Sequence, residues 1–523
     1  MVVVNYPYTD MKKLSDLPLE KVVDGLNNLG APSEYDKETK SILSEITPNR
    51  PDWYSIEGLA RSLIGYYTKK HPKYQTKKSL YQVIVDPSVA KIRPYTVCAV
   101  VKGMKFSDDR IISMIALQER LMNTLGRKVK KFGLGIYPLD KIVFPVSYTT
   151  MRPKDIRYIP LGYSQEMDAE NVLQNHKKGQ QYGHIIKGQE RYPVFIDAEN
   201  KVMCLIPIVN SAETGKVDEN TTDVFIEVSG MDIHACKAAL NILVCMFADM
   251  GGEVFQVKVK YKNGTLVVPE LAMRIVDFDL EEINKTLGLA LTKKEVVGLL
   301  ERMGYGSSGN KLLVPPYRAD VIDLVDVIED VAIAYGYNNF KPTLPDFFHP
   351  GKSADSNQEL RRTMVGMGFL EINTFILTNK DKLDRIGYVG RTVEVKNPAS
   401  EDFTTIRPTL IQDILESFSN NKVKGLPQKL FEIGIVDGGR RFCFGLMDRK
   451  IEFSDFKGYL QTIGLETGQL FELVREENKL FDKDISCSIR LRGKIIGVIG
   501  KIDSDVLNKY GIEFEVYLVQ IVI

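Results

Sequence analysis

Acidic side chains concentrate in one stretch of the sequence, where they could bind a cation. Residues 314–337 read VPPYRADVIDLVDVIEDVAIAYGY, and the Pro-Pro pair separates an expected helix from the preceding structure. At ~100° per residue, Asp326, Glu329 and Asp330 share one face of that helix. Carboxylates at these spacings repel one another, so their clustering suggests a compensating cation.

The same segment also has an ordinary structural explanation. Asp320 and Asp323 lie near the expected helix start, where the helix dipole favours carboxylates. The opposite face is apolar, with Leu324, Val325, Ile328, Val331 and Tyr335. An amphipathic helix with a solvated acidic face is therefore the alternative to a cation site.

Two other charged clusters in the sequence have structural explanations. Arg50 and Asp52 lie in TPNRPDW, between two prolines, where we expect an ion pair or a helix cap instead of a catalytic pair. The cap would be Asp52, at the start of a helix running from Trp53. Arg127, Lys128, Lys130 and Lys131 follow an expected helix over 111–125, and they either face solvent or meet RNA phosphates.

Composition excludes several classes of protein. The 523 residues carry a formal net charge of +1, so no bulk cationic field would attract nucleic acid. The six cysteines form neither a CxxC pair nor a zinc-ligand spacing, which indicates reduced thiols in a cytoplasmic protein. We find no segment resembling a signal peptide or membrane span, and no GxxxxGK[ST], GxGxxG, HExxH or GxSxG motif. A self-contained kinase or hydrolase is therefore poorly supported.

The pattern of elements predicts an α+β multidomain protein. We expect an N-terminal α/β domain over 1–90, and a domain over 91–270 with a mostly antiparallel sheet that includes a hairpin at 193–210. Residues 271–347 resemble a winged-helix-like unit, in which Thr292 and Glu295 form a capping box. Residues 348–523 read as a further α+β domain.

Seven segments in order resemble the β subunit of phenylalanyl-tRNA synthetase, in its archaeal and eukaryotic form. They span most of the chain: ITPNRPDWYSIEGLARSL, QERLMNTLGRKVKKFGLGIYPLDKI, PLGYSQEMDAENVLQNHKKGQQYGHIIKGQERYPVF, VPPYRADVIDLVDVIEDVAIAYGY, RRTMVGMGFLEINTF, VKNPASEDFTTIRPTLIQDILES and LFEIGIV. The resemblance implies an α2β2 ligase that charges tRNA(Phe) with phenylalanine, with ATP and amino-acid activation in the α subunit. It implies no catalytic residue for synthesis in this chain, whose last domain would be an inactive class II synthetase fold.

The resemblance also assigns two sites. Asp320, Asp326, Glu329 and Asp330 match the positions of Mg²⁺ ligands, with Asp323 a possible fifth contributor. The domain over 91–270 resembles a module that hydrolyses Tyr-tRNA(Phe). Its pocket positions correspond to the following residues of this sequence: Cys204, Asn210, Glu227 and Ser229. We would expect Ser, Asp and Thr where this chain has Cys204, Glu227 and Ser229, and a double proline in LIPIVN.

Two other functions remain as alternatives to the ligase subunit. One is a free-standing aminoacyl-tRNA deacylase, against which residues 271–523 argue, because a hydrolase needs no inactive synthetase domain. The other is a non-enzymatic tRNA-binding assembly protein. Formation of a charging-competent complex with an α chain distinguishes the three.

Overall fold

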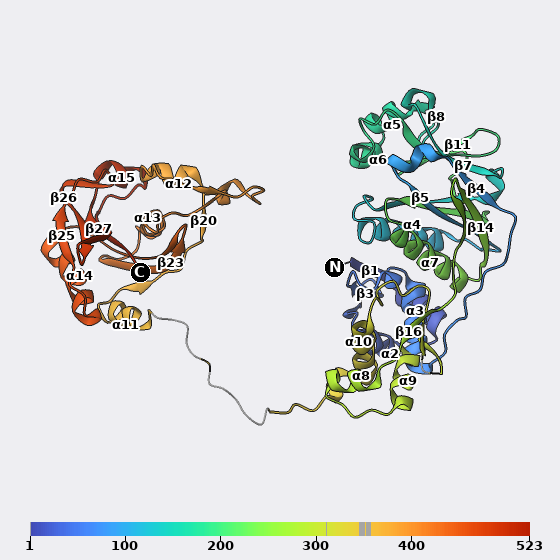
Figure 1. Ribbon diagram of the computed structural model, residues 1–523, viewed down its shortest axis with the longest axis horizontal. Helices are drawn as coiled ribbons and strands as arrows, with labels where there is room; N and C mark the ends of the chain where they lie inside the picture. The colour runs from blue at the N-terminus through green and yellow to red at the C-terminus, as the bar shows by residue number, and fades with distance from the viewer. Residues whose placement is uncertain (1, 310, 345–350, 352–356) are drawn as a thin grey trace. The chain divides into compact units, whose positions relative to one another are not determined.

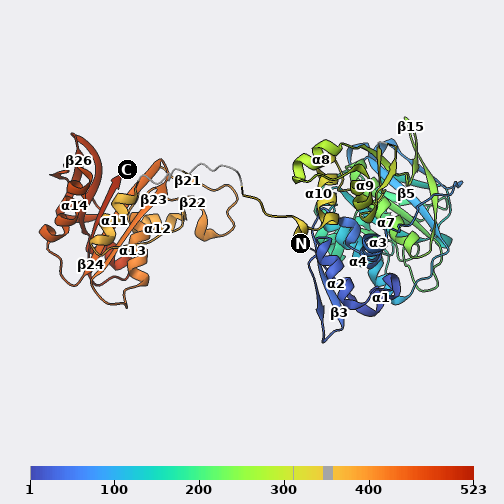
Figure 2. The ribbon, with the colours of Figure 1, turned by 90° about the horizontal axis from the view of Figure 1, so that it is seen from below.

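The computed structural model describes residues 2–309, 311–344, 351 and 357–523, in two compact units. The first unit is Met1–Leu344 and the second is Pro345–Ile523 (Figures 1 and 2). Both combine helices with β-sheets, which confirms the α+β multidomain class. The predicted boundary between residues 347 and 348 lies outside the described residues.

The chain begins with a small antiparallel sheet flanked by helices. Its strand order is β1-β3-β2, with β1 (Val2–Pro7), β2 (Ser33–Asp36) and β3 (Ser41–Ile46). The helices of this part are α1 (Tyr8–Ser15), α2 (Leu19–Asn28) and α3 (Ile56–Thr68).

The predicted start of the third helix is wrong. Ser55 caps α3 by accepting a hydrogen bond from the backbone N–H of Gly58 at 3.2 Å. Asp52 instead forms a two-bond ion pair with Arg50, at 2.8 and 2.9 Å, which confirms the alternative of a local salt bridge. The carboxylate takes this partner because the guanidinium is buried beside it and stacks on Trp53.

A ten-stranded sheet forms the centre of the first unit. Its main order is β12-β11-β10-β7-β4-β14-β5-β13-β6, and β15 pairs with β14. The strands are β4 (Gln82–Val85), β5 (Tyr95–Lys102), β6 (Phe132–Pro138), β7 (Val146–Met151), β10 (Tyr192–Ile196), β11 (Val202–Leu205), β12 (Val209–Asn210), β13 (Val224–Gly230), β14 (Glu253–Tyr261) and β15 (Gly264–Val268).

The sheet is mostly antiparallel, as predicted, and β10 and β11 form the predicted hairpin. Strand β4 is parallel to both of its neighbours, β7 and β14. Because β4 precedes residue 90, the predicted first boundary separates it from the sheet it joins. Helices α4 (Asp108–Asn123) and α7 (Ile233–Asp249) pack against the sheet.

A smaller subdomain lies at one end of this sheet (Figure 1). It contains β8 (Arg157–Tyr158), β9 (Met167–Asp168), α5 (Ala169–Asn175) and α6 (Lys177–Tyr182). Its own hydrophobic cluster, which includes Ile156, Val172 and Ile186, holds it against β10 and β11.

Residues 274–335 form the last part of the first unit. The elements are β16 (Arg274–Asp277), α8 (Leu280–Leu287), α9 (Lys293–Arg302), β17 (Gly306–Ser308), β18 (Lys311–Val314) and α10 (Leu324–Tyr335). The predicted capping box of Thr292 and Glu295 is present at the start of α9. The predicted apolar face of α10 is wrong at Val325, which is 63% exposed, whereas Val327, Ile328 and Val331 are buried in the core of the first unit.

The second unit is a seven-stranded sheet with helices on both faces. The strand order is β19-β23-β24-β28-β27-β26-β25, with β19 (Leu370–Glu371), β23 (Gln428–Val436), β24 (Gly439–Asp448), β25 (Glu472–Arg475), β26 (Phe481–Leu491), β27 (Lys494–Ile502) and β28 (Glu515–Val522).

Side chains that alternate along the strands form two separate hydrophobic cores, one on each face of the sheet. On β24, Phe442 and Phe444 enter one cluster with α11 (Gln358–Gly366) and α14 (Phe453–Thr467). Cys443 and Met447 enter the other, with α13 (Ile411–Asn420) and α15 (Ser504–Lys509). This arrangement follows from the two-residue period of a strand whose two faces are both buried.

Candidate functional site

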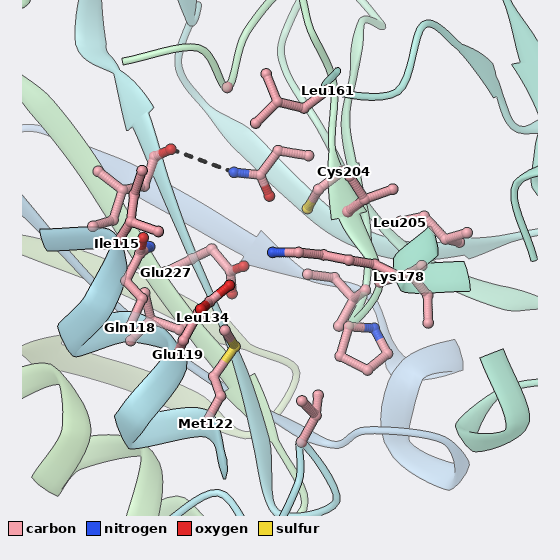
Figure 3. A pocket seen from close by; sticks show the side chains of 18 of the residues that line it. Ile115, Gln118, Glu119, Met122, Leu134, Leu161, Lys178, Cys204, Leu205 and Glu227 are labelled. Carbon is pink, nitrogen blue, oxygen red and sulfur yellow. Dashed lines mark hydrogen bonds between the residues drawn. The ribbon is translucent and has the colours of Figure 1, made fainter. Parts of the chain in front are cut away.

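A cavity of about 220 Å³ lies between strands β6, β11, β12 and β13 of the ten-stranded sheet and helices α4 and α6. The resemblance assigned four residues to a pocket that hydrolyses Tyr-tRNA(Phe). Three of them line this cavity, namely Cys204, Asn210 and Glu227. Figure 3 shows Cys204 and Glu227 approaching the cavity from different strands, with Glu119 and Met122 contributed by α4. The cavity therefore brings together polar groups that are far apart in the sequence.

Strand pairing explains how these groups meet. Cys204 on β11 lies directly opposite Asn210 on β12, because the turn through Pro207 reverses the chain. Glu227 lies in the middle of β13, opposite Gly135 on β6. A Cβ atom at position 135 would lie 2.8 Å from Oε1 of Glu227, so glycine leaves the space that this carboxylate occupies.

Ser229 does not line the cavity but supports Glu227 from behind. Its hydroxyl donates a hydrogen bond to Oε2 of Glu227 at 2.5 Å and lies 2.8 Å from the hydroxyl of Thr96. The fourth predicted pocket residue therefore contacts the cavity only through the carboxylate.

Tyr137 does not line the cavity but bonds two residues that do, and we did not predict it from the sequence. Its hydroxyl donates to Oδ1 of Asn210 at 3.2 Å and lies 3.5 Å from Oε1 of Glu227. The alternation in FGLGIYP places Tyr137 on the same face as Gly135, and small residues beside a tyrosine were the available signal. Lys178, on α6, is a second unpredicted residue, and its side chain reaches into the cavity (Figure 3).

Burial sets the protonation of this group of residues. Desolvation raises the pKa of Glu227 to about 7, although hydrogen bonds from Ser229 and Tyr137 and the charge of Arg93 oppose that rise. Burial also raises the pKa of the Cys204 thiol well above its usual value. The thiol is therefore protonated near neutral pH, and it can take part in hydrogen bonds but is not an activated nucleophile.

The raised pKa of Glu227 has a measurable consequence for stability. A carboxyl whose pKa rises from 4.5 to about 7 on folding favours the folded state while it is protonated. The free energy of unfolding therefore falls as the pH rises from about 4.5 to about 7. Because Glu227→Gln removes this titration, we expect its stability relative to wild type to increase by about 2–3 kcal/mol between pH 5 and pH 8. Denaturant unfolding at the two pH values measures the difference.

Glu119→Gln is the matched control for that experiment, because Glu119 is an exposed carboxylate on the same cavity. Its stability should follow the wild-type pH profile, since water solvates the group in both states. A Glu227→Gln profile parallel to wild type would contradict the assigned titration.

A second cavity, of about 310 Å³, contains the acidic cluster that the sequence singled out. Asp320, Asp326, Glu329 and Asp330 all line it, together with Arg50 and Arg318. Four carboxylates against two guanidinium groups leave an excess of two negative charges, which suits a hard divalent cation.

The acidic side chains have protein partners in this structure. Arg318 bonds Asp320 at 2.7 Å and Asp330 at 2.6 Å, and Asp330 also accepts from the hydroxyl of Tyr305. Although burial opposes ionisation, Arg318 holds the pKa of Asp320 below its usual value. Asp326 accepts from the backbone N–H of Asp323 at 2.8 Å in a capping box.

These contacts show what a cation would require at this site. Across the described residues, no three His, Cys, Asp or Glu side chains converge as a ready-made metal site. Asp323 is the N-cap of α10, where its side chain accepts from the N–H of Leu324. The donor chemistry fits Mg²⁺. Arg318 binds both carboxylate oxygens of Asp320, whereas Arg318 and Tyr305 both donate to Oδ2 of Asp330, which leaves Oδ1 of Asp330 for an ion.

The second unit contains a buried charge cluster around Arg407. The guanidinium is 1% exposed and donates to Asp413 at 2.9 Å, to Glu432 at 2.8 Å and to Thr374 at 2.6 Å. Its Nε donates to the carbonyl oxygen of Ile435. All three of its nitrogens are thus engaged with protein groups, so Arg407 is a structural residue and not a nucleotide ligand.

Comparisons with known proteins identify the family of the chain. Residues 355–523 match the model of the phenylalanyl tRNA synthetase beta chain CLM domain, and residues 276–337 match the tRNA synthetase B5 domain. The phenylalanine–tRNA ligase beta subunit of Archaeoglobus fulgidus is 34% identical over 528 residues, covering 98% of this chain and 96% of the relative. The chain belongs to this family.

Two further relatives agree over most of the length. The phenylalanine–tRNA ligase beta subunit of Pyrococcus horikoshii is 36% identical over 498 residues, covering 90% of this chain and 89% of the relative. The crystal structure of an N-terminal fragment of the phenylalanyl-tRNA synthetase beta subunit from the same organism superposes with a TM-score of 0.60 at 34% identity. It covers 64% of this chain and 99% of the fragment.

Membership in this family makes the chain a ligase subunit with a role in phenylalanine–tRNA ligation. This confirms the resemblance drawn from the seven sequence segments. It also removes the free-standing deacylase and the non-enzymatic assembly protein as descriptions of the whole chain. No helix among the described residues has the length and apolar character needed to cross a membrane.

Proposed function

We propose that this chain is the partner of a phenylalanine–tRNA ligase α subunit in an α2β2 complex that charges tRNA(Phe) with phenylalanine. The observation that carries the proposal is the match to beta subunits along 98% of the chain. The sequence has no phosphate-binding motif, and Arg407 is fully engaged within its own unit, so activation of the amino acid falls to the other subunit.

Co-expression with an α chain tests this assignment. The expected result is a stable complex that attaches phenylalanine to tRNA(Phe) with ATP, whereas the isolated chain does not. Failure of the two chains to associate, or an α chain that charges tRNA(Phe) fully by itself, would contradict the proposal.

The cavity at Glu227 is proposed to hydrolyse tRNA(Phe) that carries tyrosine. The side chain of the misplaced amino acid would enter beside Glu227 and Asn210, which Tyr137 holds through its hydroxyl, and its phenol hydroxyl would donate to a buried acceptor. A phenylalanyl ligand offers no such donor, and the unpaired polar groups around it penalise its binding. The protonated Cys204 lies opposite Asn210 and contributes to the shape and polarity of the same pocket.

The acidic cavity is proposed to hold Mg²⁺ through Asp320, Asp326, Glu329 and Asp330. The support is the shared cavity, the excess of negative charge and the preference of Mg²⁺ for carboxylate oxygens. Because Arg50 and Trp53 line the cavity with these residues, an ion there would stabilise the packing of residues 49–53 against α10.

Removing two of these carboxylates tests the metal site. In the α2β2 complex, Asp326→Asn with Glu329→Gln keeps the shapes of both side chains and removes two charges. The expected result is loss of Mg²⁺ from the β chain. It should also abolish the stabilisation of about 2.7 kcal/mol that wild type gains at an Mg²⁺ concentration of 100 times Kd. Metal analysis and thermal unfolding measure the two effects.

The matched control is Glu281→Gln with Glu282→Gln, which replaces two carboxylates of α8 outside this cavity, exposed Glu281 and half-buried Glu282. Bound Mg²⁺ should stay at the wild-type level in this variant. Equal metal content in wild type and in the Asp326 and Glu329 variant would exclude the site.

A further inference from the structure

Arg93 is a buried cation behind the cavity of Glu227. Its side chain is 1% exposed, on the segment that leads into β5. One of its nitrogens, Nη2, donates to the carbonyl oxygens of Val129 and Ser229, each at 3.1 Å. Within the part of the chain that the structure describes, Arg93 forms no ion pair with a carboxylate, and its Nε has no protein partner. Burying a guanidinium in this way is costly, so its presence here calls for an explanation.

One of the two carbonyl groups belongs to an unfavourable turn at the wall of the cavity. Arg127, Lys128 and Val129 have φ angles of 49°, 53° and 66°, a left-handed backbone that suits glycine and is poorest for a β-branched residue. Val129 is nevertheless fully buried and lines the cavity. Its N–H donates to the carbonyl oxygen of Met122 at 3.0 Å, and its own carbonyl oxygen accepts from Arg93. Arg93 thus fastens a turn whose side chain forms part of the wall.

The other carbonyl group lies directly behind the buried acceptor of the cavity. Ser229 accepts from Arg93 through its backbone oxygen and donates through its hydroxyl to Oε2 of Glu227 at 2.5 Å. A single residue therefore connects the guanidinium to the carboxylate. Burial raises the pKa of Glu227, and the hydrogen bond from Ser229 and the charge of Arg93 oppose that rise.

Five other titratable groups near Glu227 are uncharged near neutral pH. Burial raises the pKa of each of them, and they come from five different elements: Cys98 on β5, Tyr137 on β6, Tyr148 on β7, Cys204 on β11 and Cys236 on α7. The charged residues that line the cavity with Glu227 are Glu119, Lys178 and Lys216, and all three are exposed. Water screens these three charges, whereas the buried charge of Arg93 acts on the carboxylate through the protein interior.

We propose that Arg93 is a positioning residue of this cavity, which keeps the Glu227 carboxylate ionised and in place through Ser229 and holds the wall beside it through Val129. Its effect on substrate choice rests on the proposed hydrolysis of Tyr-tRNA(Phe), because an ionised carboxylate is the stronger acceptor for a phenol hydroxyl. Arg93 does not line the cavity, so it acts through these neighbours. It sets the pH above which the cavity selects a ligand that carries a hydroxyl donor.

Variants of the α2β2 complex separate the charge of Arg93 from its hydrogen bonds. Arg93→Gln removes the charge and keeps an N–H donor for the two carbonyl groups, whereas Arg93→Lys keeps the charge. The matched control is Arg302→Gln, because Arg302 also donates to two backbone carbonyl oxygens, those of Tyr66 and Ala334, outside the cavity. ATP–pyrophosphate exchange with phenylalanine, which needs no tRNA, checks that each complex is intact.

The first readout is the titration of Glu227, which needs no substrate. Infrared difference spectra between each variant and its Glu227→Gln counterpart report the protonated carboxyl group of residue 227 as the pH rises. In wild type its signal should disappear with a midpoint at about pH 7. We expect Arg93→Gln to raise this midpoint by about 1–2 pH units, since a neighbouring opposite charge lowers a carboxyl pKa by that order. Arg93→Lys and Arg302→Gln should keep the wild-type midpoint.

The second readout is the preference for tyrosine, measured as the ratio of kcat/KM for hydrolysis of Tyr-tRNA(Phe) to that of Phe-tRNA(Phe). In Arg93→Gln this ratio should fall about 10-fold at about pH 7 and return towards wild type at about pH 9, because one pH unit changes the ratio of the two protonation states tenfold. A purely structural defect would lower the ratio equally at every pH. The ratio also cancels the base-catalysed loss of the ester, which both substrates share.

The two readouts distinguish this proposal from the proposed hydrolysis. A raised midpoint in Arg93→Gln, in a complex whose wild type leaves Tyr-tRNA(Phe) intact, would support the role of Arg93 and count against the hydrolysis. Equal midpoints in wild type and Arg93→Gln would overturn the proposal. Arg93→Met, a second variant without the charge, takes the place of Arg93→Gln if that complex does not assemble. Failure of both to assemble would show a role in folding instead of positioning, and would overturn the proposal as well.

Discussion

Replacing Arg407 by leucine is expected to lower the free energy of unfolding of the second unit by about 3–5 kcal/mol. The substitution leaves Asp413 and Glu432 buried, with 7% and 1% of their surfaces exposed, and without the cation that compensates them. Burial already raises the pKa of Asp413 to about 6, which shows how little solvation it has. Hydrogen exchange in β23 and β24, measured in the full-length chain, reports the loss locally.

Arg475→Leu is the control, because Arg475 forms an ion pair with Asp484 that is exposed on both sides, at 69% and 87%. Removing such a pair should cost no more than about 1 kcal/mol. If the two substitutions lower the free energy of unfolding by similar amounts, burial does not determine how much the Arg407 cluster stabilises the fold.

Replacing Glu227 by valine is expected to lower kcat/KM for hydrolysis of Tyr-tRNA(Phe) by about 10- to 100-fold. This range corresponds to losing one hydrogen bond from the phenol hydroxyl to the ionised carboxylate, which is the main form of Glu227 above pH 7. The neighbours of Glu227 keep other partners, since Ser229 still meets Thr96 and Tyr137 still donates to Asn210. The pocket should therefore fold, and steady-state hydrolysis by the α2β2 complex measures the effect.

Glu57→Val controls for the general effect of removing a buried carboxylate. Glu57 is 6% exposed on α3 and does not line the cavity. Its replacement should leave the rate of hydrolysis at the wild-type level, while ATP–pyrophosphate exchange stays intact in both variants. An unchanged rate in Glu227→Val would show that this carboxylate does not receive the tyrosyl side chain.

The sequence predicted one helix cap correctly and another wrongly. The capping box at Thr292 and Glu295 could be predicted because both residues have the required type and spacing. Near residue 52 we expected Asp52 to cap the helix, whereas Ser55 caps it in the structure. Only the position of the Arg50 guanidinium decides between them, and that position depends on contacts made by the folded chain.

Contacts between residues far apart in the sequence could not be predicted at either cavity. The family pattern found Cys204, Asn210 and Glu227, and the structure gathers them at one cavity. It did not find Tyr137, which bonds Asn210 from 73 residues earlier in the chain. Spacing along α10 identified the acidic cluster, yet it could not show that Arg318 holds two of its members. Charge clusters in sequence reveal which groups are available, whereas their partners depend on tertiary packing.

Hydrolysis of Tyr-tRNA(Phe) and Phe-tRNA(Phe) by the same purified α2β2 complex tests the central claim most directly. A buried acceptor in the cavity of Glu227 predicts that the tyrosyl ester is hydrolysed at least about 10-fold faster than the phenylalanyl ester. A complex that charges tRNA(Phe) with phenylalanine but leaves Tyr-tRNA(Phe) intact would contradict it.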